Sequence, residues 1–75
     1  MMTAAQCRSA RTLLGWSVAK LASAASVSES LIDDFELERQ MPQPAAADSI
    51  QRALEAVGVD FLPGDDVRLR PAAIT

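Results

Sequence analysis

The sequence has no histidine and only one cysteine, Cys7, among its 75 residues. A single cysteine cannot form a disulfide within the chain, and a structural zinc site needs histidine or several cysteines as ligands. These absences exclude two common ways in which short domains gain stability. A chain of this length forms one domain with a thin core, so helix packing and self-association are the remaining sources of stability.

Catalytic and membrane-spanning features are missing as well. No nucleophile has a histidine base, and the 3 glycines form no phosphate-binding loop. The adjacent acids Asp65 and Asp66 are ordinary turn residues rather than a cation site. No apolar run approaches the roughly 20 residues that cross a bilayer, and Arg8 and Arg11 interrupt any signal-peptide pattern. We expect a soluble, cytoplasmic protein that is not an enzyme and uses no metal or cofactor.

Positive charge is scarce and unevenly distributed. The net charge is −3, and residues 27–50 hold six acids with Arg39 as their one base, whereas residues 1–26 hold three bases and no acid. Affinity for nucleic acid comes largely from Lys and Arg side chains that neutralise phosphates. An acidic domain therefore starts at an electrostatic disadvantage for DNA binding.

Capping residues predict three short helices in the first half of the chain. Thr3 can cap a helix to about Leu14, which Gly15 would end. Ser17 and Ser28 can cap the second and third helices, which run to about residues 25 and 37 with a tight turn between them. On the third helix the core side is set by Ile32 and Phe35, so the opposite side faces outward.

The second half predicts one more helix and a hairpin. Pro44 or Ala45 opens a fourth helix that Gly58 ends, with an apolar stripe formed by Ile50, Leu54 and Val57. Alternating apolar and polar residues in the range 59–70, interrupted by a Pro-Gly-Asp turn, predict a short β-hairpin and a candidate dimerisation element. Residues 71–75 would be a frayed tail.

Two helices joined by a tight turn are typical of a helix-turn-helix, here at about residues 17–38 within a domain of residues 1–58. Over residues 5–62 the chain resembles the DNA-binding domain of phage repressors and Cro, the xenobiotic-response-element-like family. The matching positions are Arg11, Leu14-Gly15-Trp16-Ser17, Leu21-Ala22, Val27-Ser28, Ile32, Phe35 and Glu36. The expected fold is therefore mainly α, a small four-helix, lambda-repressor-like domain with a short C-terminal β-hairpin.

The resemblance also implies residue roles. Arg11 and Glu36 would form a structural ion pair, and Lys20 and Arg39 would contact phosphate or a partner. The family binds double-stranded DNA operators as dimers, which implies a homodimeric, repressor-like transcription regulator. The face that would meet DNA or a partner comprises Val18, Ser28, Glu29, Ser30, Asp33, Asp34 and Leu37.

Several positions depart from the family pattern. Val18 replaces a phosphate-binding glutamine, Ser26 replaces a turn glycine, and Leu37-Glu38 stands where an Arg-Gly pair is usual. Two functions remain open. The protein binds operator DNA through its third helix, or it keeps the fold, has lost DNA binding, and uses exposed Val18, Leu37 and Met41 to bind another transcription regulator as an anti-activator or anti-repressor.

Overall fold

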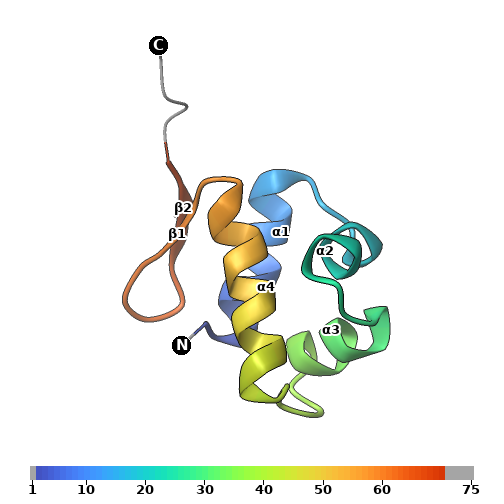
Figure 1. The fold of residues 1–75 in the computed structure, drawn as a ribbon. Helices are drawn as coiled ribbons and strands as arrows, with labels where there is room; N and C mark the ends of the chain where they lie inside the picture. The colour runs from blue at the N-terminus through green and yellow to red at the C-terminus, as the bar shows by residue number, and fades with distance from the viewer. Residues whose placement is uncertain (1, 71–75) are drawn as a thin grey trace.

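The computed structural model describes residues 2–70, and the predicted tail at residues 71–75 lies outside the described residues (Figure 1). Four helices are followed by a two-stranded antiparallel hairpin, so the prediction of a mainly helical domain with a C-terminal hairpin is confirmed. The elements are α1 (Ala4–Leu14), α2 (Val18–Ala25), α3 (Glu29–Glu36), α4 (Pro44–Ala56), β1 (Val59–Phe61) and β2 (Val67–Leu69).

The helix ends follow from local side-chain chemistry. Thr3 and Gln6 form a capping box at the start of α1, in which each side chain accepts a hydrogen bond from the other residue's backbone N–H. Ser17 and Ser28 cap α2 and α3 by accepting from backbone N–H groups in the first turn. Gly15 ends α1 in the left-handed region at φ 67°. These caps lie where the sequence predicts them.

The core lies between α4 and the other three helices. Figure 1 shows α2 and α3 on one side of α4 and the hairpin on the other. Ala22 and Ala25 on α2 are buried, and their small side chains allow α2 to pack closely against α3 and α4. The largest fully buried side chains are Phe35, Leu21, Ile32, Ile50, Leu54, Val59 and Cys7.

The apolar stripe predicted for α4 is wrong at its last residue. Ile50 and Leu54 are buried, but Val57 is exposed. Val57 is the C-cap, at φ −104° and ψ 15°, so the chain has already left helical geometry and the side chain no longer follows the stripe. Val59 at the start of β1 fills the core instead, with no exposed surface.

The hairpin packs on α1 and α4. Gln6 on α1 is buried, and its side-chain amide donates to the carbonyl oxygens of Leu62 and Asp66 at 2.8 and 3.0 Å. The sequence offered no reason to place this glutamine under the hairpin, because its partners are backbone groups more than fifty residues away. A two-stranded ribbon is marginal alone, and this support from α1 holds it on the domain.

Two residues other than glycine adopt a positive φ, Ser26 at 59° and Glu38 at 58°. A side chain in this conformation costs about 1 kcal/mol or more. We therefore expect Ser26→Gly and Glu38→Gly each to raise the free energy of unfolding by about 0.5–1 kcal/mol, after allowing for the greater freedom of glycine in the unfolded chain. Urea denaturation measures the change.

The matched control is Ala24→Gly, at an exposed position inside α2. This change should lower the free energy of unfolding by about 1 kcal/mol, because the helix interior disfavours glycine. A loss of stability in Ser26→Gly comparable with that of the control would contradict the assignment of strain to Ser26.

Candidate functional site

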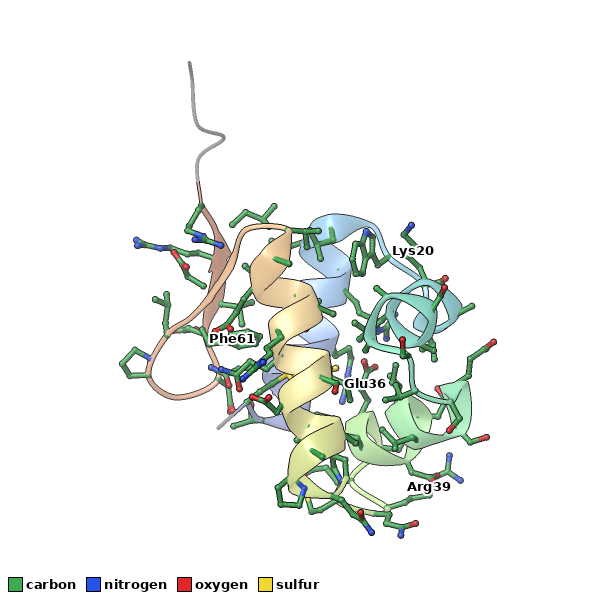
Figure 2. All side chains as sticks on the ribbon, viewed as in Figure 1. Lys20, Glu36, Arg39 and Phe61 are labelled. Carbon is green, nitrogen blue, oxygen red and sulfur yellow. The ribbon has the colours of Figure 1, made fainter. Side chains whose placement is uncertain are left out.

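The end of α3 is fixed to α1 by an ion pair. The guanidinium of Arg11 donates to both carboxylate oxygens of Glu36, at 2.7 Å from Nε to Oε2 and 2.6 Å from Nη2 to Oε1. The side chains are 17% and 7% exposed, so the pair is largely shielded from water. Figure 2 shows Glu36 pointing into the molecule, toward α1. The ion pair implied by the family resemblance is thus present in the structure.

Two further groups of α1 contact Glu36. The Cys7 thiol donates to Oε2 at 3.2 Å, and Arg8 Nη2 donates to the Glu36 carbonyl oxygen at 3.0 Å. Burial acts to raise the pKa of Glu36, but the hydrogen bonds from Arg11 and Cys7 outweigh it, so the pKa lies below its ordinary value. Burial and the bond to Glu36 raise the pKa of Cys7, which keeps the thiol protonated and unreactive.

A tight turn connects α2 to α3. Ser26 lies in the left-handed region at φ 59° and ψ 43°, and the Val27 N–H donates to the Ala22 carbonyl at 3.0 Å. This is the conformation that a glycine adopts at little cost. The turn between α2 and α3 is therefore formed with serine, rather than glycine, in the left-handed conformation.

The face predicted for recognition is mostly exposed. Glu29, Ser30 and Asp33 are exposed on α3, Asp34 is half-buried, and Leu37 just beyond the helix is 59% exposed. Ser30, Asp33, Asp34 and Leu37 lie on the side of α3 opposite Ile32 and Phe35, and Glu29 lies at the edge of this face, as the helical spacing predicts.

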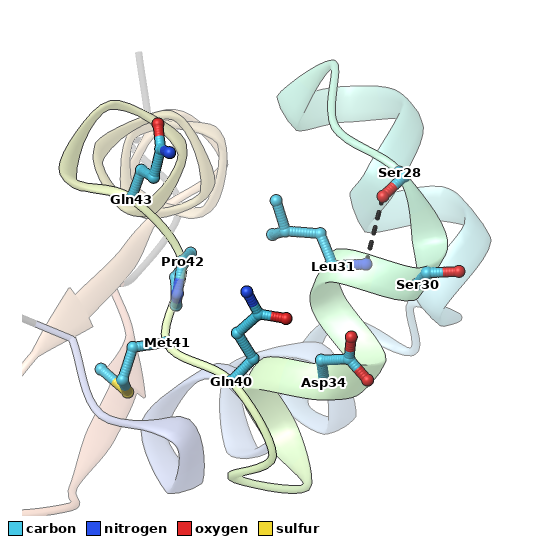
Figure 3. Close-up of a pocket in the computed structure, with 8 residues that line it drawn as sticks. All are labelled: Ser28, Ser30, Leu31, Asp34, Gln40, Met41, Pro42 and Gln43. Carbon is cyan, nitrogen blue, oxygen red and sulfur yellow. Dashed lines mark hydrogen bonds between the residues drawn. The ribbon is translucent and has the colours of Figure 1, made fainter.

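Two residues predicted for this face, Val18 and Ser28, are less accessible to a ligand. Val18 is half-buried and packs against the core, so the prediction that it is exposed is wrong. Val18 is three and four residues before the buried Leu21 and Ala22, so helical spacing places it on the core side of α2. The Ser28 hydroxyl accepts the Leu31 N–H at 3.1 Å as the cap of α3 (Figure 3).

Positive charge near α3 is largely engaged within the domain. The Lys20 ammonium lies 5.6 Å from the centroid of the Trp16 ring, a cation–π contact. Arg39 Nε lies 3.7 Å from Asp34 Oδ1. Figure 2 shows Lys20 and Arg39 on the surface, so both can still reach a ligand. Within residues 2–70, no ion pair is formed by the remaining acids of this region, Glu29, Asp33 and Glu38.

A groove of about 350 Å³ runs beside α3 (Figure 3). One wall belongs to α3 and its cap, and the other is the loop that leads to α4. Leu31 and Met41 make its apolar part, and Asp34 lies on its rim. The remaining lining residues are Pro42 and the polar Ser28, Ser30, Gln40 and Gln43. The sequence did not indicate Leu31 as a site residue, because the loop that faces it is positioned only by tertiary packing.

The described residues contain no group of three or more Cys, Asp or Glu side chains that could hold a metal ion. None of the helices in residues 2–70 is long and apolar enough to cross a membrane. The surface around α3 carries hydrogen-bonding groups, acids and the exposed apolar side chains of Leu37 and Met41.

Comparison with known proteins identifies no family. No protein-family model matches the chain, and no curated protein matches it. The exposed face of α3 is acidic and has one apolar end at Leu37.

Proposed function

We propose that the protein is a transcription regulator that binds double-stranded DNA by placing α3 in the major groove. The main support is that α3 presents an exposed face at a fixed angle behind a tight turn, with its far end held by Arg11 and Glu36. The major groove of B-DNA admits one α-helix. Rigid placement matters because base contacts require side chains in fixed positions.

The exposed groups fit particular partners in the groove. The Ser30 hydroxyl can donate or accept, and the Glu29 and Asp33 carboxylates can accept from the cytosine amino group. Lys20 and Arg39 would contact phosphates, Arg39 after its weak interaction with Asp34 is exchanged. In this proposal the protein acts on DNA in the cytoplasm and regulates transcription at an operator.

The test is a titration against genomic fragments, including the promoter of its own gene, at several salt concentrations. If both Lys20 and Arg39 of each copy in a dimer reach phosphates, the slope of log affinity against log salt should be about −3.6. Lys20→Ala should make this slope less steep by about 1 for each lysine removed. Absence of specific binding at low salt would overturn the proposal.

A second candidate function is binding of another regulator protein through the same face. It is supported by charge, since Glu29, Asp33 and Glu38 have no ion-pair partner within residues 2–70 and would repel phosphates. Exposed Leu37 and Met41 stand beside these acids, and an apolar patch with a charged rim suits a protein partner. The partner would carry a basic rim around an apolar centre.

DNA binding by the wild type and partner binding by Leu37→Glu distinguish the two functions. If a protein is the ligand, the wild type should bind no DNA at low salt, and Leu37→Glu should abolish binding of a purified partner while Ala56→Glu, at an exposed position on α4, leaves it unchanged. Equal partner binding by both variants would contradict a protein-binding role for this face.

A further inference from the structure

The outer edge of β2 has unpaired backbone groups. The Arg70 N–H donates to the Gly58 carbonyl at 2.7 Å, and the Leu62 N–H donates to the Asp66 carbonyl at 3.0 Å. Hydrogen-bonded pairs alternate along an antiparallel ladder, so Asp60 and Arg68, which are opposite each other, form the bonded pair between these two. The N–H and C=O groups of the two remaining β2 residues therefore point away from β1.

Those two residues are Val67 and Leu69. In the part of the chain that the structure describes, neither their N–H nor their C=O groups have a hydrogen-bond partner. Leu69 is also 41% exposed. A free strand edge with an exposed apolar side chain is a template for pairing with another strand.

A groove lies where the hairpin turn and the start of β2 meet α1. Its volume is about 370 Å³, and it is lined by Leu13 and Val67 together with the polar residues Arg8, Ser9, Thr12, Asp65 and Asp66. Leu13 is 46% exposed. A strand that paired with β2 would place its inward-facing side chains over this groove, where Leu13 offers an apolar contact.

We propose that the occupant is β2 of a second copy, paired antiparallel about a twofold axis at Arg68 to give a four-stranded sheet. Only the outward-pointing residues Val67 and Leu69 can bond, so the axis must lie at residue 67, 68 or 69. With the axis at Arg68, Val67 of each copy pairs with Leu69 of the other, and all the unpaired groups are satisfied.

In this register, opposite charges of the two β2 strands face each other. Asp66 of each copy is opposite Arg70 of the other, which gives two cross-strand pairs of opposite charge. The two Arg68 side chains meet at the axis, and each has its own Asp60 at 3.4 Å to offset the repulsion.

The alternative registers are poorer. An axis at Leu69 would set Arg68 opposite Arg70 twice and would use Pro71, which has no N–H. An axis at Val67 would set the turn residue Asp65 opposite the apolar Leu69. The axis at Arg68 is therefore the favoured one. This dimer needs no DNA and does not depend on which function α3 performs.

Sedimentation equilibrium without DNA tests the interface. The wild type should form a dimer, and Asp66→Arg should raise the dimer Kd about tenfold or more, since two favourable pairs become two repulsive ones. The double variant Asp66→Arg/Arg70→Asp should restore the Kd, because the charges are exchanged. A wild type that stays monomeric, or a folded double variant no tighter than Asp66→Arg, overturns the proposal.

Arg70 also donates to the Glu55 carbonyl and lies 3.2 Å from Asp60, so its replacement could loosen the hairpin itself. Arg68→Thr provides a second test that leaves Asp66 and Arg70 in place. It removes the like-charge contact at the axis and should lower the dimer Kd about threefold. An unchanged or higher Kd for this variant would overturn the register.

Discussion

Replacing Glu36 by glutamine is expected to lower the free energy of unfolding by about 3 kcal/mol. The change leaves the guanidinium of Arg11 without a charged partner in a site where it is 17% exposed, and loss of one member of a buried pair costs about 3–5 kcal/mol. The lower end applies because Arg11 keeps some contact with water. A domain of 75 residues has only about 4–11 kcal/mol in total, so the variant should lose between about a quarter and three quarters of its stability. Urea denaturation measures the shift in midpoint.

Two controls separate this effect from an ordinary loss of charge. The double variant Arg11→Met/Glu36→Leu should recover most of the stability, because no unpaired charge remains. Arg52→Ala breaks the exposed pair between Arg52 and Asp48 and should change the free energy by less than about 0.5 kcal/mol. A Glu36→Gln protein as stable as the Arg52→Ala protein would contradict the buried role of the pair.

The same variant should alter the acid sensitivity of the fold. The pKa of Glu36 is lower in the folded protein than in the unfolded chain, so its contribution to stability is present above about pH 4.3 and is lost as pH falls through the folded pKa. Glu36→Gln should therefore flatten the dependence of stability on pH in this acidic range. An identical pH dependence in both proteins would argue against this coupling.

Removing negative charge from the α3 face should increase affinity for DNA if DNA is the ligand. In the triple variant Glu29→Gln/Asp33→Asn/Glu38→Gly, three repulsive charges disappear while the core side of α3 is untouched. A unit charge about 6 Å from a phosphate in water costs roughly 0.7 kcal/mol. The expected gain for three charges is about thirtyfold in non-specific affinity at low salt. Fluorescence anisotropy with a labelled duplex measures it.

The matched control removes acids at a distance from α3. Asp48→Asn/Glu55→Gln neutralises two exposed acids on α4 and should change DNA affinity much less. Equal gains in both variants would mean that only net charge matters and that α3 is not the binding face. No DNA binding by the triple variant at low salt would favour the protein-binding function.

Local chemistry made the helices predictable. Thr3, Ser17 and Ser28 are capping residues and Gly15 ends a helix, and each acts within a few residues of its own position. The prediction for Val57 failed because it extended helical spacing beyond the last helical residue. Periodicity indicates which face is apolar, but it does not say where the chain leaves the helix.

The candidate site was only partly predictable. Helical spacing placed Glu29, Ser30 and Asp33 on the outer face of α3, and the structure agrees. Spacing also places Val18 three and four residues before the buried Leu21 and Ala22, so its burial could have been predicted. Spacing could not show that the loop after α3 forms a groove with Leu31. This groove depends on how separate elements pack, which is a long-range property.

The sequence by itself determined the helices, their caps, the hairpin and the acidity of the third helix, because each follows from side chains close together along the chain. Only the tertiary structure decided which charges remain available. Folding brings Arg8 and Arg11 to Glu36, and the hairpin onto Gln6. The net charge counted from the sequence does not show which charges of α1 and α3 neutralise each other, because their pairing is set by the packing of residues distant in sequence.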